Sequence, residues 1–160
     1  MPDFFDFSFL ADSFEPGLKL LAALALGILL GAERTIAHKT DVLRTFGLVS
    51  MGACLFIVAS TTLDDIVNAE IMRVVAGVIT GIGFLGAGII IFRENTIINL
   101  TTAAGLWIAV GIGISVGFEL YGIAITATVL TLIVFSVFRW LEEQVRDFAE
   151  EIEHTPEKNL

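Results

Sequence analysis

The chain has 160 residues, of which 56% are hydrophobic and 17% charged, and its mean hydropathy is +0.86. Soluble domains contain about 45–50% apolar residues, so this composition excludes an ordinary soluble domain and indicates a protein embedded in a lipid bilayer. The formal net charge of −9 excludes a nucleic-acid-binding protein, which would need the opposite sign.

Residues 1–17 mix phenylalanines with acids before the first apolar run. The positions at which a cleaved export signal carries positive charge are acidic: Asp3, Asp6, Asp12 and Glu15. We therefore expect the first apolar run to remain in the protein. The interleaved phenylalanines predict a short segment at the membrane interface. Disorder is the alternative, given Pro2 and Pro16.

Five apolar runs follow, and uncharged runs of about 18 residues predict membrane-spanning helices. The expected spans are Leu18–Ala32, Phe46–Leu63, Val74–Phe92, Thr102–Phe118 and Leu120–Phe138. The first and fourth are short for a bilayer that takes about 17–25 residues per helix. The sequence therefore predicts an all-α fold, a polytopic transmembrane bundle of five spans over residues 18–138.

Basic residues gather in the links on one side of this bundle and after the fifth span: Arg34, Lys39, Arg44, Arg93, Arg139, Arg146 and Lys158. The other side holds the acidic N-terminus with Lys19, then Asp64, Asp65, Glu70, Arg73 and Glu119. The positive-inside rule places the N-terminus outside and the C-terminus in the cytoplasm.

Residues 139–160 are predicted to form an acidic, amphipathic cytoplasmic tail. Apolar residues recur at steps of three and four, which places them on one face of a helix: Phe138, Leu141, Val145, Phe148 and Ile152. Anionic lipid would repel the acidic opposite face, so we favour a self-association seam, and with it a homo-oligomer. A solvated extension of the fifth span is the alternative.

A glycine pattern in the third span matches a dinucleotide-binding fingerprint, through Gly81, Gly83 and Gly86. That fingerprint needs a preceding strand and a water-facing helix start, and a spanning run supplies neither. We interpret the glycines as sites of close helix packing: Gly77, Gly81, Gly83, Gly86 and Gly88, continued by Gly113, Gly117 and Gly122. A discontinuous helix around Gly86–Gly88, as in transporters, is the alternative.

The link between the third and fourth spans is unusually polar. Thr101 or Thr102 is expected to cap the fourth span. The same helix start is alternatively an anion site for a carboxylate or phosphate. Trp107 lies too deep for an interfacial tryptophan, so we expect it to pack on a neighbouring helix rather than face a ligand.

Glu33 is the charge that topology explains least, because it ends the first span, where the helix dipole disfavours an acid. We expect it to pair with Arg44 or Arg93. For Arg34 and Arg44, the positive-inside rule is a sufficient explanation.

Metal and catalytic signals are weak. Asp64, Asp65 and Glu70 carry oxygen ligands suited to Mg²⁺, with a solvated loop as the alternative. The two histidines, His38 and His154, offer neither a catalytic triad nor a zinc ligand set. Cys54 lies inside an apolar run and is expected to be buried. We expect no enzyme and no cofactor beyond Mg²⁺.

Two blocks of sequence carry a family resemblance. The first contains Gly31-Ala-Glu-Arg34, Lys39, Leu43-Arg-Thr45 and Leu48–Phe56. The second contains Arg73, Gly81–Gly88, Leu100-Thr-Thr-Ala-Ala104 and Leu106-Trp107. Over residues 18–138 the chain resembles the membrane domain of the MgtC/SapB family. It departs at Asp41-Val42, where the family commonly has Ala-Gly, and at Asn99, where a glycine usually precedes Leu-Thr-Thr.

The resemblance implies a bacterial inner-membrane protein linked to magnesium limitation and, in pathogens, to virulence. It also implies regulatory contacts with other inner-membrane proteins, such as the proton-driven ATP synthase, rather than Mg²⁺ transport. Many members carry a soluble C-terminal domain after the spans, which we do not expect in this chain. The matched polar positions are the expected site: Glu33, Arg34, Lys39, Arg44, Thr45, Arg73, Thr101 and Thr102.

Two functions therefore compete. A non-enzymatic regulatory protein that binds membrane partners rests mainly on the resemblance. A transporter or channel for a small ion or solute, such as Mg²⁺, K⁺ or phosphate, rests on charge at membrane depth and on interrupted helices. Its path would be lined by Glu33, Arg44 and the segment Gly86–Thr102.

Overall fold

The computed structural model describes residues 14–36, 42–62, 68–93 and 96–153. In these ranges it contains five helices and one short hairpin: α2 (Phe14–Ile36), α3 (Val42–Thr61), α4 (Asn68–Ile89), β1 (Ile91–Arg93), β2 (Thr96–Ile98), α5 (Leu100–Gly117) and α6 (Tyr121–Glu153). All five helices are long and apolar enough to cross a membrane. The predicted bundle of five spans is confirmed.

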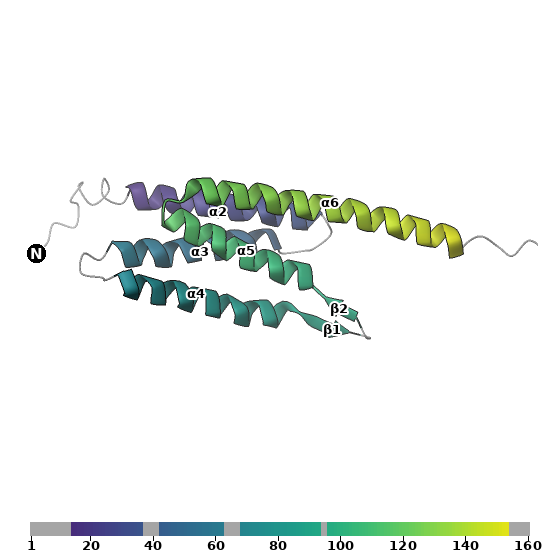
Figure 1. Cartoon of the computed structure of the whole chain (residues 1–160), viewed down its shortest axis with the longest axis horizontal. Helices are drawn as coiled ribbons and strands as arrows, with labels where there is room; N and C mark the ends of the chain where they lie inside the picture. Colours follow the sequence, from purple (N-terminus) through teal and green to yellow (C-terminus); the bar gives the residue numbers. More distant parts are fainter. Residues whose placement is uncertain (1–13, 37–41, 63–67, 94–95, 154–160) are drawn as a thin grey trace, which may run out of the picture.

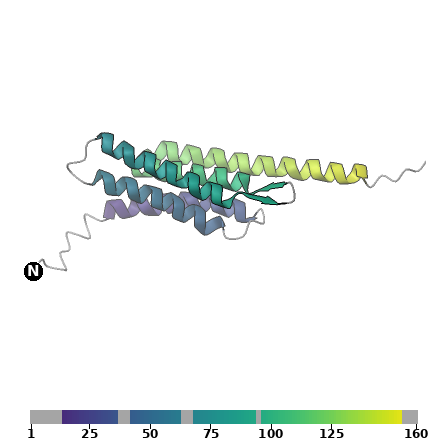
Figure 2. The same cartoon turned by 90° about the horizontal axis from the view of Figure 1, so that it is seen from below.

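The helices lie roughly side by side, with their ends at two opposite faces of the bundle (Figures 1 and 2). The last turn of α2, the first turn of α3, the hairpin and the first turn of α5 lie at one end, which we name the hairpin end. The start of α2 and the turn between α5 and α6 lie at the opposite end. Successive helices therefore run in opposite directions, as expected when spans are connected through short links.

Two boundaries differ from those expected. Helix α2 begins at Phe14, so residues 14–17 belong to the first span, whereas the rest of the predicted interfacial segment lies outside the described residues. Helix α6 is continuous over 33 residues, so the fifth span and much of the acidic tail form one helix. At 1.5 Å per residue it is about 50 Å long, and it projects past the hairpin end (Figure 1).

The hairpin corrects two predictions. The third span was expected to run to Phe92, but α4 ends at Ile89 and antiparallel pairing of Ile91 with Ile98 follows. Among the described residues, the fold is thus helical except for this hairpin and the turns. The alternative of a discontinuous helix around Gly86–Gly88 is wrong, because α4 is helical through both glycines. The backbone changes direction after α4 ends, not inside the helix. There the pairing of β1 with β2 satisfies the backbone polar groups.

The core lies where α2, α3 and α5 cross. Gly27 of α2 comes so close to α3 that an added Cβ would lie 2.6 Å from the carbonyl oxygen of Phe46. Gly113 of α5 is closer still, because its Cβ would lie 2.0 Å from the carbonyl oxygen of Ser50. Close packing at Gly113 and Gly117 is therefore confirmed. Cys54 is fully buried in this core, as predicted.

Candidate functional site

A cluster of charged side chains joins α2 to α6 at the hairpin end. The Glu33 carboxylate accepts a hydrogen bond from Arg34 Nε at 2.9 Å and another from Arg139 Nη1 at 2.9 Å. Glu33 and Arg34 are only 8% and 9% exposed. Charged side chains buried at the ends of membrane-spanning helices are usually paired and are typical of functional positions. We name Glu33, Arg34 and Arg139 the charged cluster.

Aromatic packing fixes the orientation of Arg34 in the charged cluster. Its guanidinium stacks on the Phe135 ring, 3.6 Å from the ring centroid. The ring fits there because α5 has a glycine beneath it: a Cβ on Gly105 would lie 2.8 Å from Phe135 Cζ and equally close to Phe46 Cζ. Gly105, Phe135 and Arg34 thus form a stack across α5, α6 and α2, and this stack positions the charges.

The pairing expected between Glu33 and Arg44 is wrong. Glu33 pairs with its neighbour Arg34 and with Arg139, which lies 106 residues away, and Arg44 is exposed. The last turn of α2 faces α6 rather than the start of α3, and this decides which arginine reaches the carboxylate. Arg93 lies in β1, and its side chain is outside the described part of the structure. From the sequence, Arg139 contributes only to the predicted orientation of the spans. Its position just before the charged part of α6 is the one feature that could have indicated a further role.

The start of α5 also differs from the prediction. Asn99, not Thr101 or Thr102, is the N-cap residue, with no side-chain bond to the first turn of the helix. Its φ of 69° lies in the left-handed region, where glycine and asparagine are tolerated best, and its Nδ2 donates to the carbonyl oxygen of Ile89 at 3.1 Å. This conformation explains why a glycine suits the same position. Thr102 is buried inside α5 and Thr101 is exposed.

The other predicted residues that the structure describes are not part of the charged cluster. Trp107 is 54% exposed and points out of the bundle, so its expected packing on a neighbouring helix is not found within one chain. Thr45 is exposed on α3. Glu70 is exposed near the start of α4, at the opposite end, whereas Lys39, Asp64 and Asp65 lie outside the described residues. In the part of the chain that the structure describes, no group of three metal-ligating side chains comes together.

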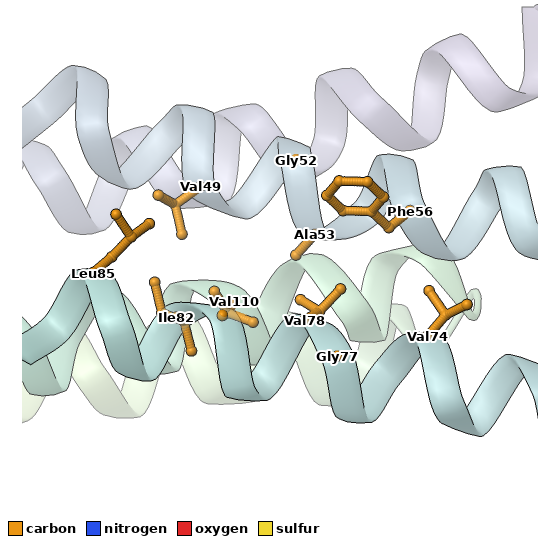
Figure 3. Close-up of a pocket in the computed structure, with 11 residues that line it drawn as sticks. Val49, Gly52, Ala53, Phe56, Val74, Gly77, Val78, Ile82, Leu85 and Val110 are labelled. Atoms are coloured by element: carbon orange, nitrogen blue, oxygen red, sulfur yellow. The ribbon is translucent and has the colours of Figure 1, made fainter.

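A second feature is an apolar groove of about 500 Å³ between α3, α4 and α5 (Figure 3). Its lining consists only of apolar side chains and glycines: Val49, Gly52, Ala53, Phe56, Val74, Gly77, Val78, Gly81, Ile82, Leu85 and Val110. Figure 3 shows Ile82 and Val78 of α4 on one side and Val49 and Ala53 of α3 on the other. Such a groove suits an apolar occupant.

The groove changes the interpretation of the glycines in α4. An added Cβ at Gly77, Gly81, Gly83 or Gly88 would meet nothing within 4 Å, and at Gly86 it would only touch Ala103 at 4.0 Å. Close packing at these glycines is therefore not found within one chain. The reason is that α4 is the least buried of the five helices. Gly77 and Gly81 face the groove instead.

Comparison with known proteins agrees with this architecture. The model of the MgtC family matches residues 20–144, which include α3, α4, α5, most of α2 and α6, and the charged cluster. The chain belongs to the MgtC family. It is 40% identical over 129 residues to "Putative magnesium transporter YhiD" of Escherichia coli K12, and 43% identical over 116 residues to "Protein MgtC" of Salmonella typhimurium 14028s.

These alignments cover different shares of each MgtC-family protein. They include 76% and 72% of this chain, but only 59% of the Escherichia coli protein and 48% of the Salmonella protein. The chain therefore spans about half the length of the curated relatives it matches. No solved structure matches it.

Proposed function

We propose that this protein is a non-enzymatic regulator that holds an apolar transmembrane helix of a partner in the groove between α3, α4 and α5, in a role connected with magnesium supply. The observation that carries the proposal is the wholly apolar lining of that groove. Pores and ion sites are lined by carbonyl, carboxylate or other polar groups. A groove without such groups supports binding of another apolar surface rather than of an ion.

The glycines of the groove favour a helix as the occupant. Helices associate in membranes through small residues that let their backbones approach closely. Gly77 and Gly81 are one turn apart on α4, line the groove and have free space above them. An incoming helix would meet backbone there, with the larger side chains of Val78 and Ile82 beside it.

The membrane setting of the proposal follows the distribution of charge. Arginines at the hairpin end favour a cytoplasmic location for that end, with the start of α2 outside, in the inner membrane of a bacterial cell. The name of the Escherichia coli relative refers to magnesium transport, which supports a role connected with magnesium supply. Inner-membrane proteins, including the ATP synthase, are the proposed class of partner, and a second copy of the chain is also expected to associate.

Photo-crosslinking in intact membranes tests the groove. A photoreactive amino acid at Leu85, inside the groove, should give a discrete crosslinked product, and one at Ile133, exposed on α6, should not. Gly81→Leu should abolish the product by filling the groove. Gly83→Leu is the matched control, because Gly83 lies on the same helix with the same free space but outside the groove lining. Equal products from all variants would overturn the proposal.

Transport is the second candidate, favoured by the name of the Escherichia coli relative and by the buried Glu33. Purified protein in liposomes with a trapped Mg²⁺ indicator separates the two functions. We expect Mg²⁺ entry no faster than in empty liposomes. Entry that depends on Glu33, and is lost in Glu33→Gln but kept in Glu119→Gln, would establish transport and refute a purely regulatory role. The same comparison applies to K⁺ and phosphate.

A further inference from the structure

The charged cluster is not neutral. Two arginines share one carboxylate, so Glu33, Arg34 and Arg139 together keep one positive charge. Both carboxylate oxygens are engaged, Oε2 by Arg34 and Oε1 by Arg139. Among the described residues, no second acid forms an ion pair with either arginine. Glu33 and Arg34 are held largely away from water, where an excess charge is costly, so an anion bound at the cluster would stabilise it.

The free donors of the charged cluster suit an oxyanion. A guanidinium carries five N–H donors in a planar fork, and each arginine uses one nitrogen toward Glu33. The Phe135 ring covers a face of Arg34 and leaves the donors at its edge. The Arg139 side chain is 34% exposed, against 11% for Arg34. An anion would therefore enter beside Arg139, and phosphate oxygens match two guanidinium forks better than a spherical ion does.

The depth of the charged cluster matches the lipid headgroups. The apolar part of α6 ends at Leu141, two residues beyond Arg139. Trp140 is 59% exposed, as is typical of tryptophans in the interfacial belt. Glu33 and Arg34 lie in the last turn of α2. All three charges are thus near the plane in which phospholipid phosphates lie, where basic pockets between helices recognise anionic headgroups.

We propose that the charged cluster is a phosphate-binding site in which Arg34 and Arg139 hold the phosphate group and Glu33 fixes the spacing of the two guanidiniums. An anionic phospholipid headgroup and free inorganic phosphate share this chemistry. The depth of the cluster favours the phospholipid. The site is separate from the groove between α3, α4 and α5 and does not depend on the function proposed for it.

Native mass spectrometry of the full chain, purified in detergent with phosphatidylglycerol, tests the site. Wild-type protein should retain phosphatidylglycerol, and Arg139→Gln should bind it about tenfold more weakly, the loss expected for a charge-assisted contact. Arg139→Lys keeps the charge beside Glu33 but lacks the fork, so its affinity should lie between the two. Arg73→Gln removes the same charge from exposed α4 near the opposite end and should bind as wild type does.

Competition identifies the source of the phosphate. If millimolar inorganic phosphate leaves the lipid bound, the headgroup is the ligand. If wild-type protein binds inorganic phosphate but no lipid, and Arg139→Gln reduces that binding, free phosphate is the ligand. The proposal is overturned if the wild type retains neither phosphatidylglycerol nor inorganic phosphate, or if Arg139→Gln and Arg73→Gln bind the ligand equally well. Glu143→Gln removes an acid one turn beyond Arg139. Retention of the ligand by this variant alone would also overturn the proposal. Arg139→Lys, which keeps the charge beside Glu33, takes the place of Arg139→Gln in this comparison if Arg139→Gln does not fold.

Discussion

Replacing Gly113 by alanine tests the closest helix crossing in the bundle. The new Cβ would lie 2.0 Å from the Ser50 carbonyl oxygen, 2.8 Å from its carbonyl carbon and 3.0 Å from Ala53 Cβ. The first two obstacles are backbone atoms, so no side-chain rotation relieves the clash and α5 must move away from α3. Overpacking in a tight core costs about 1–3 kcal/mol, and a clash with the Ser50 backbone places Gly113→Ala at the upper end.

Gly111→Ala is the matched control, because it adds the same methyl group to the same helix where nothing lies within 4 Å. It should be neutral or stabilising by up to about 1 kcal/mol, the helix preference for alanine over glycine. Both free energies of unfolding are measured by denaturant titration in detergent micelles, with helix content as the signal. If Gly113→Ala proved as stable as Gly111→Ala, the close approach of α3 and α5 would be refuted.

Three further substitutions, two of them with a control variant, probe other parts of the bundle in the same assay. Glu33→Gln leaves two arginines facing an uncharged amide and should cost about 3 kcal/mol, whereas Glu119→Gln, at the exposed ion pair with Lys19, should cost less than about 1 kcal/mol. Asn99→Ala removes both the hydrogen bond to Ile89 and the tolerance for positive φ, so it should lower the free energy of unfolding by about 2 kcal/mol. Asn99→Gly keeps the tolerance for positive φ and should cost clearly less. Ser50→Ala should be neutral or stabilising by up to about 1 kcal/mol, because among the described residues the buried Ser50 Oγ has no hydrogen-bond partner. A large loss for Ser50→Ala would mean that the hydroxyl is bonded after all.

The sequence predicted the parts of the fold that depend on local hydrophobicity. Uncharged runs such as Phe46–Leu63 are long enough to span a bilayer whatever their neighbours are, so the number of spans and their alternating direction followed. Helix ends were less predictable. Asn99 ends a hairpin and starts α5 through its left-handed conformation, and two threonines that follow it look like better caps by side-chain chemistry alone.

Packing partners were beyond the reach of a single sequence. Glycines in α4 and α5 look alike as small residues, yet Gly113 is pressed against α3 while Gly83 faces open space. The difference depends on how each helix is rotated about its own axis. Glu33 was recognised as an unusual acid, but its true partner Arg139 is 106 residues away. Only the crossing of α2 and α6 reveals that partner, and a lone arginine after an apolar run has an ordinary explanation in topology.

The ion pairs also explain why α4 is the helix that leaves a groove open. Lys19 joins the start of α2 to Glu119 at 2.7 Å, and Glu33 joins the end of α2 to Arg139 on α6. Helix α2 is therefore fastened to the chain around α6 at both ends, and glycine contacts hold α2 and α5 against α3. No ion pair fastens α4 within the part of the chain that the structure describes. An occupant of the groove would thus act on α4 while the charged cluster stays intact, so the two sites can work independently.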